Sequence, residues 1–349
     1  MNTKQVKAYG AETKESDLKP MHIPRRDPQA HDVELQILFC GVCHSDLHTA
    51  KNDWGMTQYP VVPGHEIVGK VTRIGSATTK HAVGDTVAVG CLVDSCRTCG
   101  SCKNDLEQYC PARVGTYGGH DTYLNTPTHG GYSNRIVVHE DFVLRVPNNL
   151  DLAGLAPVLC AGITSWSPLR HWKVGKGSHV AVVGLGGLGH MALKLAHALG
   201  ARVTLFSRSA HKMADAKALG ADEVIISTDD AQMKKAANQF DLIIDTVPYA
   251  HDLNPYVGTL AINGTLVIVG YLGPLDPMLA TVPMITGRRS VAGSLIGGIA
   301  ETQELLDFCG EHNITSDIEV IPMQEINTAY ERMLKSDVKY RFVIDMESL

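Results

Sequence analysis

The sequence His179-Val-Ala-Val-Val-Gly-Leu-Gly-Gly-Leu-Gly189 decides the fold of the second half of this chain. Residues 179–183 are a short apolar run typical of a buried strand, and residues 190–199 repeat apolar side chains at helical spacing. Between them stand Gly184, Leu185, Gly186, Gly187, Leu188 and Gly189, which fit the pattern G-x-G-x-x-G. Because glycine lets the backbone turn tightly and approach a pyrophosphate at a helix N-terminus, this arrangement predicts a dinucleotide-binding site.

Strand and helix patterns continue to alternate after this turn. Strands are expected at 202–206, 223–226, 242–245 and 265–269, with a helix at 211–219 between the first two. Alternation of this kind predicts an α/β fold with a doubly wound parallel sheet and helices on both faces. We expect this domain to span residues 157–294.

The rest of the chain is predicted to be β-rich. Strand-like segments occur at 33–39 and 67–74, and the chain ends in another strand pattern at 340–345. We therefore expect residues 1–156 and 295–349 to form one domain, into which the α/β domain is inserted.

The turn after residues 202–206 indicates which dinucleotide binds. An NAD enzyme carries Asp or Glu about 20 residues after the glycine turn, bonded to the ribose 2′-hydroxyl. No acidic residue stands there in this chain, and the turn instead contains Ser207, Arg208, Ser209 and Lys212. Hydroxyl and cationic side chains suit a 2′-phosphate, which arginine can grip with two hydrogen bonds. We therefore predict NADP(H), against the alternative that these residues form only a solvated basic turn.

Four cysteines lie close together in the first half, at Cys96, Cys99, Cys102 and Cys110. Four thiolates at this spacing can complete a tetrahedral zinc site without help from distant parts of the chain. A C-x₂-C-x₂-C run also occurs in ferredoxins, but the spacing before the fourth cysteine is shorter there than here. We predict a structural zinc site that staples the long irregular segment 92–130.

Composition limits the classes of protein to consider. The chain has 349 residues, enough for two domains, of which 44% are hydrophobic and 19% charged. Its net charge of −6 argues against nucleic acid or an anionic membrane as partner. The N-terminus lacks the apolar core of a signal peptide, and no apolar run approaches the ~20 residues that span a bilayer. We expect a cytoplasmic protein, in which nine cysteines favour metal binding over disulfides.

Three further segments carry a resemblance to a known family. They are Gly41-Val-Cys43-His44-Ser45-Asp46-Leu-His48, Pro63-Gly64-His65-Glu66 and Leu159-Cys160-Ala-Gly-Ile-Thr164. Together with the glycine turn and the cysteine cluster, they make the whole chain resemble the zinc-dependent alcohol dehydrogenases of the medium-chain dehydrogenase/reductase superfamily. More narrowly, it resembles the cinnamyl alcohol dehydrogenase group and its bacterial broad-range aldehyde reductases. The resemblance implies a GroES-like β-rich catalytic domain interrupted by a Rossmann domain.

The resemblance also implies a second, catalytic zinc site. Cys43, His65 and Cys160 match its ligands, and three protein ligands leave one position open for substrate. Glu66 matches a carboxylate that can replace water as the fourth ligand. Asp46 matches an acceptor that holds the imidazole of His65 in its ligating tautomer.

A proton relay and a cofactor site are implied in the same way. Ser45 and His48 match the relay, and histidine suits this task because its pKa lies near working pH. The remaining cofactor contacts are implied for His44, Thr164, Thr246, Gly270, Ser294, Leu295 and Ile296.

The implied reaction is reversible hydride transfer between NADPH and an aldehyde, either aromatic, such as cinnamaldehyde or benzaldehyde, or medium aliphatic, giving a primary alcohol. The implied partners are this small substrate, two zinc ions per chain, and a second copy of the chain in a homodimer. Trp54 and Trp166 are candidates to line an apolar substrate pocket, or else are core aromatics.

Two alternatives stay open. One is a polyol or secondary-alcohol dehydrogenase of the same superfamily, although such enzymes usually lack a cysteine at the position of Cys160. The other is a non-catalytic NADPH-binding redox sensor whose four-cysteine zinc site responds to oxidants. The open zinc site and the relay pair argue against the sensor, which needs neither.

Overall fold

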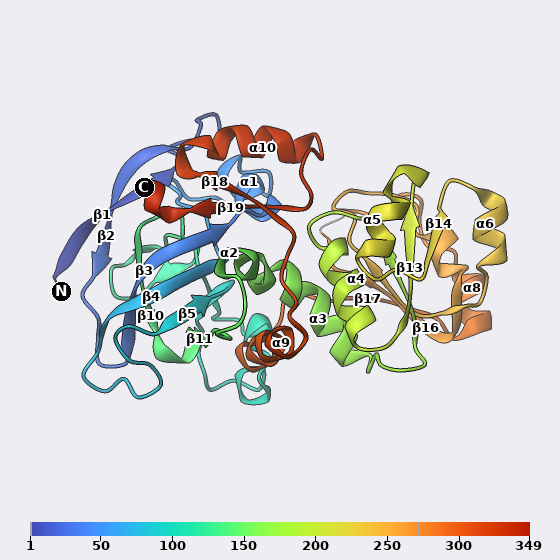
Figure 1. Ribbon diagram of the computed structural model, residues 1–349, viewed down its shortest axis with the longest axis horizontal. Helices are drawn as coiled ribbons and strands as arrows, with labels where there is room; N and C mark the ends of the chain where they lie inside the picture. Colours follow the sequence, from blue (N-terminus) through green and yellow to red (C-terminus); the bar gives the residue numbers. More distant parts are fainter. Residues whose placement is uncertain (1, 271–272) are drawn as a thin grey trace. The chain divides into compact units, whose positions relative to one another are not determined.

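The computed structural model describes residues 2–270 and 273–349, which form two compact units. The first unit contains Met1–Cys160 and Gly297–Leu349, and the second contains Ala161–Ile296 (Figure 1). The chain therefore leaves the first unit once and returns to it.

The first unit is built on a seven-stranded sheet in the order β11-β5-β4-β3-β19-β18, with β10 paired to β3. All pairs are antiparallel except β18 with β19. The central strand is β3, in which the alternating apolar residues Val33, Leu35 and Ile37 are all buried. The strands are β3 (Asp32–Gly41), β4 (Ile67–Ile74), β5 (Thr86–Val89), β10 (Arg135–His139), β11 (Leu144–Arg145), β18 (Ile318–Pro322) and β19 (Arg341–Asp345).

Short elements surround this sheet. A hairpin of β1 (Thr3–Gly10) and β2 (Lys19–Arg26) stands apart from it as a separate two-stranded sheet. Residues 92–130 form the irregular lobe that the sequence predicts, because its elements have only two or three residues each. They are β6 (Leu92–Asp94), β7 (Val114–Gly115), β8 (His120–Asp121), β9 (Thr126–Pro127) and the 3₁₀ turns η1 (Cys102–Asn104) and η2 (Glu107–Tyr109).

The helices of the first unit come from both of its chain segments. They are α1 (His44–Ala50), α2 (Leu152–Leu155), α9 (Ile299–His312), α10 (Ile326–Leu334) and the 3₁₀ turns η3 (Glu140–Phe142), η4 (Ala156–Leu159), η6 (Met323–Glu325) and η7 (Met346–Ser348). The α10 helix was not predicted, although Ile326, Ala329, Tyr330 and Met333 are buried at the helical spacing that would have revealed it.

The second unit is a six-stranded sheet in the order β14-β13-β12-β15-β16-β17, and every pair is parallel. This order reverses direction between β12 and β15, which makes that point the switch at which such sheets bind ligands. The doubly wound parallel sheet predicted from the sequence is therefore confirmed. Its strands are β12 (His179–Val183), β13 (Arg202–Ser207), β14 (Glu223–Ile226), β15 (Phe240–Asp245), β16 (Leu260–Ile268) and β17 (Ser290–Gly293).

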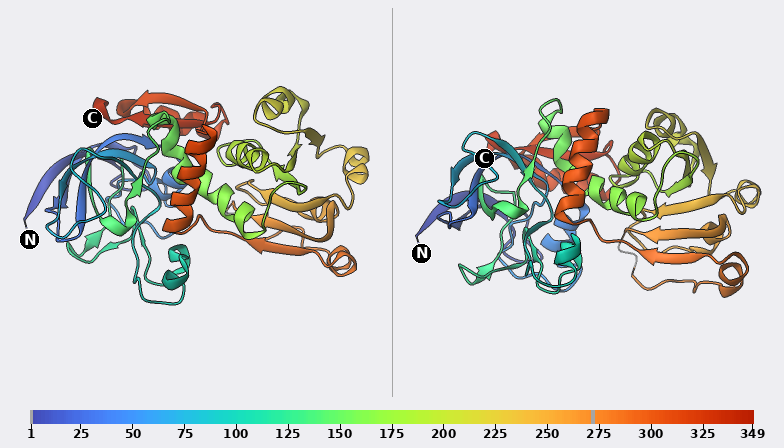
Figure 2. Two further views of the ribbon diagram at one scale, coloured as in Figure 1. Left: turned by 60° about the horizontal axis from the view of Figure 1, so that its bottom comes forward. Right: turned by 90° about the horizontal axis from the view of Figure 1, so that it is seen from below.

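Helices cover this sheet (Figure 2). They are α3 (Ala161–His171), α4 (Gly189–Ala198), α5 (Met213–Ala218), α6 (Asp230–Lys235), α7 (Asn254–Val257), α8 (Thr281–Gly287) and the turn η5 (Ala210–Lys212). The short α6 was missed, although Asp229 caps it by accepting from the backbone N–H groups of Ala231 and Gln232. Strand β16 starts at Leu260 rather than 265, because a bulge near Asn263, whose φ is 65°, interrupts the apolar pattern.

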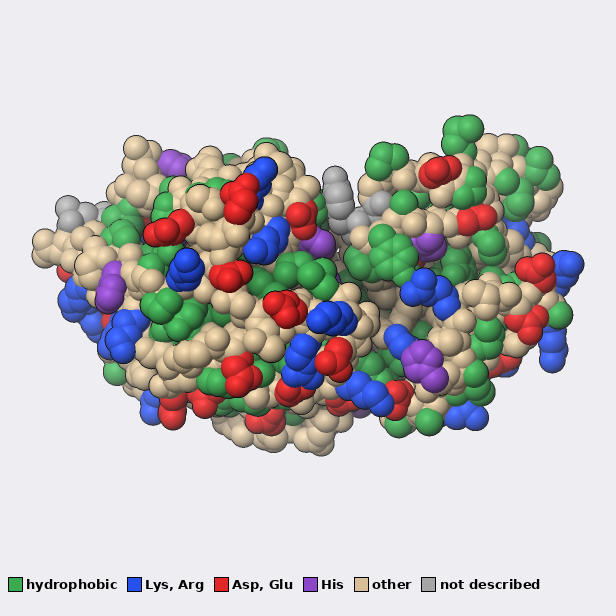
Figure 3. Space-filling model, turned by 90° about the horizontal axis from the view of Figure 1, so that it is seen from above, with side chains coloured by type: hydrophobic (Ala, Val, Ile, Leu, Met, Phe, Trp, Pro, Cys, Tyr) green, Lys and Arg blue, Asp and Glu red, His purple; other side chains and the backbone are tan. Residues whose placement is uncertain are grey.

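No single helix within residues 2–270 or 273–349 is long and apolar enough to cross a membrane, although the bent pair Leu152–Leu159 and Ala161–His171 reaches that length and composition. Most side chains of that pair are buried in the protein. On the face drawn in Figure 3, cationic and anionic side chains are interspersed over the surface.

Arg25, in β2, connects the N-terminal hairpin to residues 129–135, which lead into β10. Its guanidinium donates to the carbonyl oxygens of His129, Gly130 and Arg135 and to the hydroxyl of Ser133, each at 2.9 Å. The Nδ1 atom of His129 is buried and has no hydrogen-bond partner among the described residues. Burial, with the nearby Arg25 charge, lowers the pKa of His129 to about 4.

Folding lowers the pKa of this histidine, so its contribution to the free energy of unfolding is fully present above the pKa of ~6.5 that histidine has in the unfolded chain. The contribution is lost as the pH falls from there toward 4. We expect His129 to contribute about 2 kcal/mol to the loss of unfolding free energy between pH 7.5 and pH 5. Urea titrations of the zinc-loaded protein at both pH values measure it, with His129→Gln as the control that cannot titrate. Equal pH dependence in both proteins would contradict this assignment.

Candidate metal centres and cofactor site

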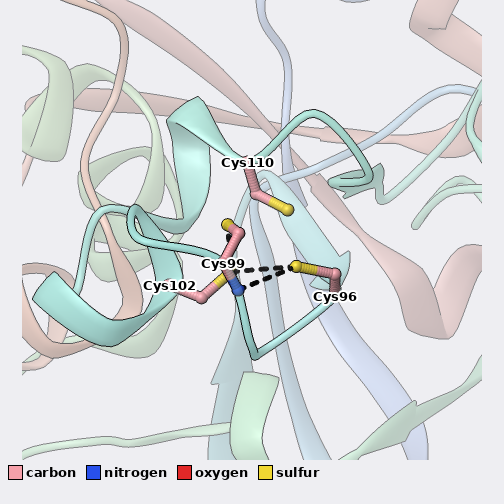
Figure 4. Close-up of side chains that lie close together, drawn as sticks. All are labelled: Cys96, Cys99, Cys102 and Cys110. Carbon is pink, nitrogen blue, oxygen red and sulfur yellow. Dashed lines mark hydrogen bonds between the residues drawn. The ribbon is translucent and has the colours of Figure 1, made fainter.

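The four predicted structural ligands converge in the irregular lobe. Figure 4 shows Cys96, Cys99, Cys102 and Cys110 turned toward one another, and their four sulfur atoms all lie within 4.8 Å of one another. The Cys102 sulfur is 3.5 Å from that of Cys99 and 3.9 Å from that of Cys96. Sulfur atoms bound at ~2.3 Å to a tetrahedral zinc ion lie ~3.8 Å apart. The cluster therefore has the donor type and the spacing of a four-cysteine zinc centre.

Backbone groups in this lobe favour thiolates. The N–H of Cys99 donates to the Cys96 sulfur at 3.3 Å, and the N–H of Ala112 donates to the Cys110 sulfur at 3.3 Å. Hydrogen bonds from the backbone of Thr98 and Cys99 lower the pKa of Cys96 to about 6. Because zinc binds the deprotonated thiol, these donors prepare the cluster for the metal.

The second predicted set also comes together, from segments far apart in the sequence. Cys43 precedes α1, His65 and Glu66 precede β4, and Cys160 follows η4. One ligand atom from each of these four residues lies within 4.8 Å of all the others, and the two sulfur atoms are 3.9 Å apart. A hydrogen bond from Cys160 lowers the pKa of the Cys43 thiol well below its ordinary value, although burial opposes this shift.

Asp46 is completely buried and accepts four hydrogen bonds. Its Oδ1 accepts from the backbone of Gly64 and from His65 Nδ1, both at 3.1 Å. Its Oδ2 accepts from the backbone of Cys43 at 2.9 Å and from the Tyr132 hydroxyl at 3.1 Å. Burial alone would lower the pKa of His65, but the Asp46 carboxylate raises it well above its ordinary value. Because Nδ1 is the donor to Asp46, Nε2 is the ring atom left to bind a metal.

Glu66 is held by a second buried charge. Its Oε1 accepts a hydrogen bond from Arg341, which also donates to the carbonyl oxygen of Val42 at 2.8 Å. Burial raises the pKa of Glu66 to about 8, although Arg341 opposes this shift. The other oxygen, Oε2, is buried without a partner among the described residues, and a Cβ at position 41 would stand 1.9 Å from it, so a larger residue than Gly41 would displace this oxygen. A buried carboxylate oxygen with no donor fits a cation that would complete the site.

The predicted relay residues lie on α1. Ser45 and His48 are three residues apart and so share one face of the helix. His48 Nδ1 is 2.7 Å from Asp53, a partner that the sequence analysis missed because nothing local marks this pairing. The ring of Trp54 lies 5.5 Å from that of His48, as a pocket-lining aromatic could. Trp166 is only 1% exposed, so it is a core residue and its interpretation as a pocket residue is wrong.

Two further residues lie beside the second cluster and were not predicted. Tyr117 has its ring 5.5 Å from the ring of His65. The Cys91 thiol donates to the Leu159 carbonyl oxygen at 3.7 Å, and its interaction with the Cys160 thiol lowers the pKa of Cys91. Tyr117 adds an aromatic surface beside the cluster, and Cys91 adds a third thiol.

The glycine turn of the second unit has the geometry its sequence predicts. Gly184 has a φ of 91°, which favours glycine, and a Cβ at Gly189 would stand 2.1 Å from the Gly184 carbonyl oxygen. A Cβ at Gly186 would meet nothing within 4 Å, so the turn is open where a pyrophosphate would approach. Thr246, at the end of the neighbouring strand β15, donates to the Val183 carbonyl oxygen at 2.7 Å. The turn and Thr246 thus flank the switch point of the sheet.

The basic turn follows β13. Lys212 donates from Nζ to the carbonyl oxygen of Leu185 at 3.0 Å, which places this cation beside the glycine turn. Ser207 donates to the Ser209 carbonyl oxygen at 2.9 Å and so closes the turn that exposes Arg208. The remaining predicted contacts of this unit occupy α3 or the carboxyl ends of β16 and β17, namely Thr164, Gly270, Ser294, Leu295 and Ile296. His44 is an exposed residue of the first unit.

Two family models match this chain: the alcohol dehydrogenase GroES-like domain over residues 29–148, and the zinc-binding dehydrogenase domain over residues 187–311. The NADP-dependent alcohol dehydrogenase C 1 of Mycolicibacterium smegmatis is 54% identical over 347 residues, 99% of each chain. A probable mannitol dehydrogenase of Medicago sativa is 53% identical over 346 residues, 98% of this chain and 95% of its own. A cinnamyl alcohol dehydrogenase structure from Sorghum bicolor has a TM-score of 0.95 and 48% identity, covering 99% and 98% of the two chains. These matches confirm the predicted family resemblance and fold class.

Asp46→Asn tests the hydrogen-bonding account of the second cluster. The amide oxygen of asparagine can replace one carboxylate oxygen of Asp46. The amide NH₂ takes the place of the other oxygen and cannot accept the two hydrogen bonds that this oxygen accepts. We expect the metal affinity of this cluster to fall about 10- to 100-fold, while the four-cysteine cluster keeps its zinc. Competition with a chromogenic chelator measures both, with Asp229→Asn at the cap of α6 as control. Unchanged release, or loss of both ions together, would contradict the account.

Proposed function

This chain belongs to the zinc-binding alcohol dehydrogenase family with a GroES-like domain, and we propose that it interconverts aldehydes and primary alcohols with NADP(H). The observation that carries this proposal is the second cluster, in which two thiols, an imidazole and a carboxylate converge and one carboxylate oxygen has no partner in the part of the chain that the structure describes. A closed structural site has four fixed protein ligands, whereas catalytic zinc sites keep one position available. The cluster therefore supports a metal that also meets a substrate.

Cys43, His65 and Cys160 fit zinc by donor chemistry and by spacing, since their sulfur atoms lie 3.9 Å apart. When bound, zinc supplies Lewis acidity toward the substrate oxygen, and the nicotinamide cofactor carries the hydride. The chain's own contribution is to hold the ligands ready. Asp46 fixes the His65 tautomer, and Arg341 keeps the Glu66 carboxylate in place beside them.

The relay residues move the proton. An alcohol that becomes an aldehyde loses a proton as well as a hydride, and the proton must reach water. Asp53 accepts from His48 Nδ1, so Nε2 is the atom that takes up and releases the proton. The His48 side chain is 29% exposed, which lets it exchange protons with solvent. Ser45, on the same face of α1, is the hydroxyl that hands the proton on.

Preference for NADP(H) is supported by the basic turn. Arg208 and Lys212 supply two cations, Ser207 and Ser209 supply hydroxyl groups, and the end of β13 carries no acid. An acid would be needed to accept from the 2′-hydroxyl of NAD(H) and would repel a 2′-phosphate. The printed name of the Mycolicibacterium smegmatis relative supports the same cofactor.

For the substrate we propose an aromatic or medium aliphatic aldehyde. The aromatic rings of Tyr117 and Trp54, next to His65 and His48, support an apolar substrate. A polyol is the second candidate, because the Medicago sativa relative is named a probable mannitol dehydrogenase. Cys160 disfavours it, since polyol enzymes of the superfamily usually lack a cysteine at that position.

We also propose a cytoplasmic homodimer. Strand β17 lies at the edge of the parallel sheet, and an edge strand can pair with a strand of a second copy. Exposed apolar side chains occur nearby, since Ile262 of β16 is 72% exposed and Ile285 of α8 is 77% exposed. Such exposure in a folded protein supports association.

The decisive assay follows NADPH and NADH oxidation with cinnamaldehyde, benzaldehyde, hexanal, a ketone and fructose, before and after chelation. We expect NADPH to be oxidised faster than NADH with the aldehydes, and chelation to abolish the reaction because the substrate oxygen then loses its Lewis acid. Fastest turnover with fructose would favour the polyol candidate. No turnover with any substrate, despite full zinc loading, would contradict the proposal.

His48→Ala tests the relay. Removing a positioned proton-transfer group typically costs about 10²-fold or more, so we expect kcat to fall by that factor while zinc content stays unchanged. Asp53→Asn should give a smaller loss, because it frees the imidazole without removing it. Turnover and metal content are measured on the same preparations. A fully active His48→Ala enzyme would exclude this residue from the proton path.

A further inference from the structure

An aromatic residue faces the predicted phosphate-binding arginine. The guanidinium carbon of Arg208 lies 5.8 Å from the centre of the Tyr249 ring, within cation–π range. Arg208 is exposed, and its guanidinium has no carboxylate partner within the described ranges of the chain. Tyr249 is 49% exposed, an unusual position for a tyrosine that serves only the core.

The turn that carries Tyr249 is anchored at its start. Residues 246–251 follow β15, and Thr246 is fastened to the Val183 carbonyl oxygen by its backbone N–H at 3.2 Å and by its hydroxyl at 2.7 Å. The N–H of Val247 donates to the Asp245 carboxylate at 3.1 Å. Val183 is the residue directly before the glycine turn, so this anchor ties the Tyr249 turn to the dinucleotide site.

The other end of the turn is anchored by an ion pair between a partly exposed histidine and a buried carboxylate. His251 Nε2 lies 3.1 Å from Asp245 Oδ2, and neither atom has any other hydrogen-bond partner among the described residues. His251 Nδ1 lies 2.9 Å from the Tyr249 carbonyl oxygen, which it reaches as a donor. Both ring nitrogens therefore face oxygen atoms, as a charged imidazolium requires. Asp245 accordingly raises the pKa of His251, and the fully buried carboxylate fixes the ring and the Tyr249 backbone with it.

We propose that Tyr249 is a positioning residue for Arg208 and, through it, a determinant of NADP(H) over NAD(H). This inference rests on the proposed function, because it concerns the 2′-phosphate of the same cofactor. A flexible arginine loses rotamer freedom when it grips a phosphate, and a ring that already holds the guanidinium lowers that cost. The ring leaves the N–H donors at the edge of the guanidinium free for the phosphate oxygens.

Binding of cofactor fragments tests this role without turnover. The probes are 2′,5′-ADP and 5′-AMP, which differ only in the 2′-phosphate, titrated calorimetrically into the zinc-loaded full-length protein. We expect Tyr249→Leu to weaken 2′,5′-ADP about two- to fivefold with 5′-AMP unchanged, the range of an exposed cation–π contact. Tyr249→Phe keeps the ring and should bind both probes like the wild type. An unchanged 2′,5′-ADP affinity, or an equal loss for both probes, would overturn the role.

Two controls test whether a loss of affinity in Tyr249→Leu comes from its contact with Arg208 or from the removal of any exposed ring. Tyr123→Leu removes a comparable exposed ring, which lies 4.3 Å from the guanidinium carbon of Arg26 in the first unit, and should change neither affinity. In an Arg208→Ala background, Tyr249→Leu should have no further effect on 2′,5′-ADP, and a persisting loss would show that Tyr249 acts without Arg208. If the wild type binds both probes equally, the proposed cofactor is wrong, and the inference falls with it. If it prefers 2′,5′-ADP while Tyr249→Leu is silent, only the inference fails.

Discussion

The first unit depends on one fully buried carboxylate. Asp46 pairs with the imidazole of His65, and its charge is compensated by four hydrogen bonds, from Cys43, Gly64, His65 and Tyr132. A buried carboxylate without such donors would cost several kcal/mol. These donors come from the start of α1, the segment before β4 and the segment before β10. The hydrogen bonds that stabilise this buried charge therefore also hold the ligand-bearing segments together, and one of them orients the His65 ring.

A second buried charge extends this arrangement to the C-terminus. Arg341, in β19, pairs with Glu66 and donates to the carbonyl oxygen of Val42, so the returning tail becomes part of the cluster rather than a cover over it. Gly41 leaves the space that the Glu66 carboxylate occupies. The two cysteine clusters differ accordingly. The four-cysteine lobe is local and is prepared by backbone donors, whereas the second cluster exists only when the whole unit has folded. In the second cluster, Glu66 Oε2 has no partner among the described residues, whereas the four-cysteine cluster already contains four sulfur ligands.

Features made by residues close together in the sequence could be predicted, whereas features made by residues far apart in the sequence mostly could not. The four-cysteine cluster and the glycine turn are local patterns, and both have the predicted geometry. The second cluster spans the unit, and its ligands were found only because the combination of three segments resembles a family. Asp53, Tyr132 and Arg341 were missed because each is a single residue whose partner is defined by the fold. Trp166 was weighed as a pocket residue because composition cannot tell a core aromatic from a lining one. Roles in catalysis and in cofactor binding stay predictions for the experiments above.

The most direct test of the account is anomalous diffraction from crystals of the purified protein at the zinc absorption edge. The account predicts two peaks per chain, one among the four cysteines and one within about 2.0–2.3 Å of Cys43 Sγ, His65 Nε2 and Cys160 Sγ. His65 Nδ1 should remain on Asp46. A single peak in the irregular lobe, or a metal bound through His65 Nδ1, would contradict the claim that Asp46 prepares a second metal centre.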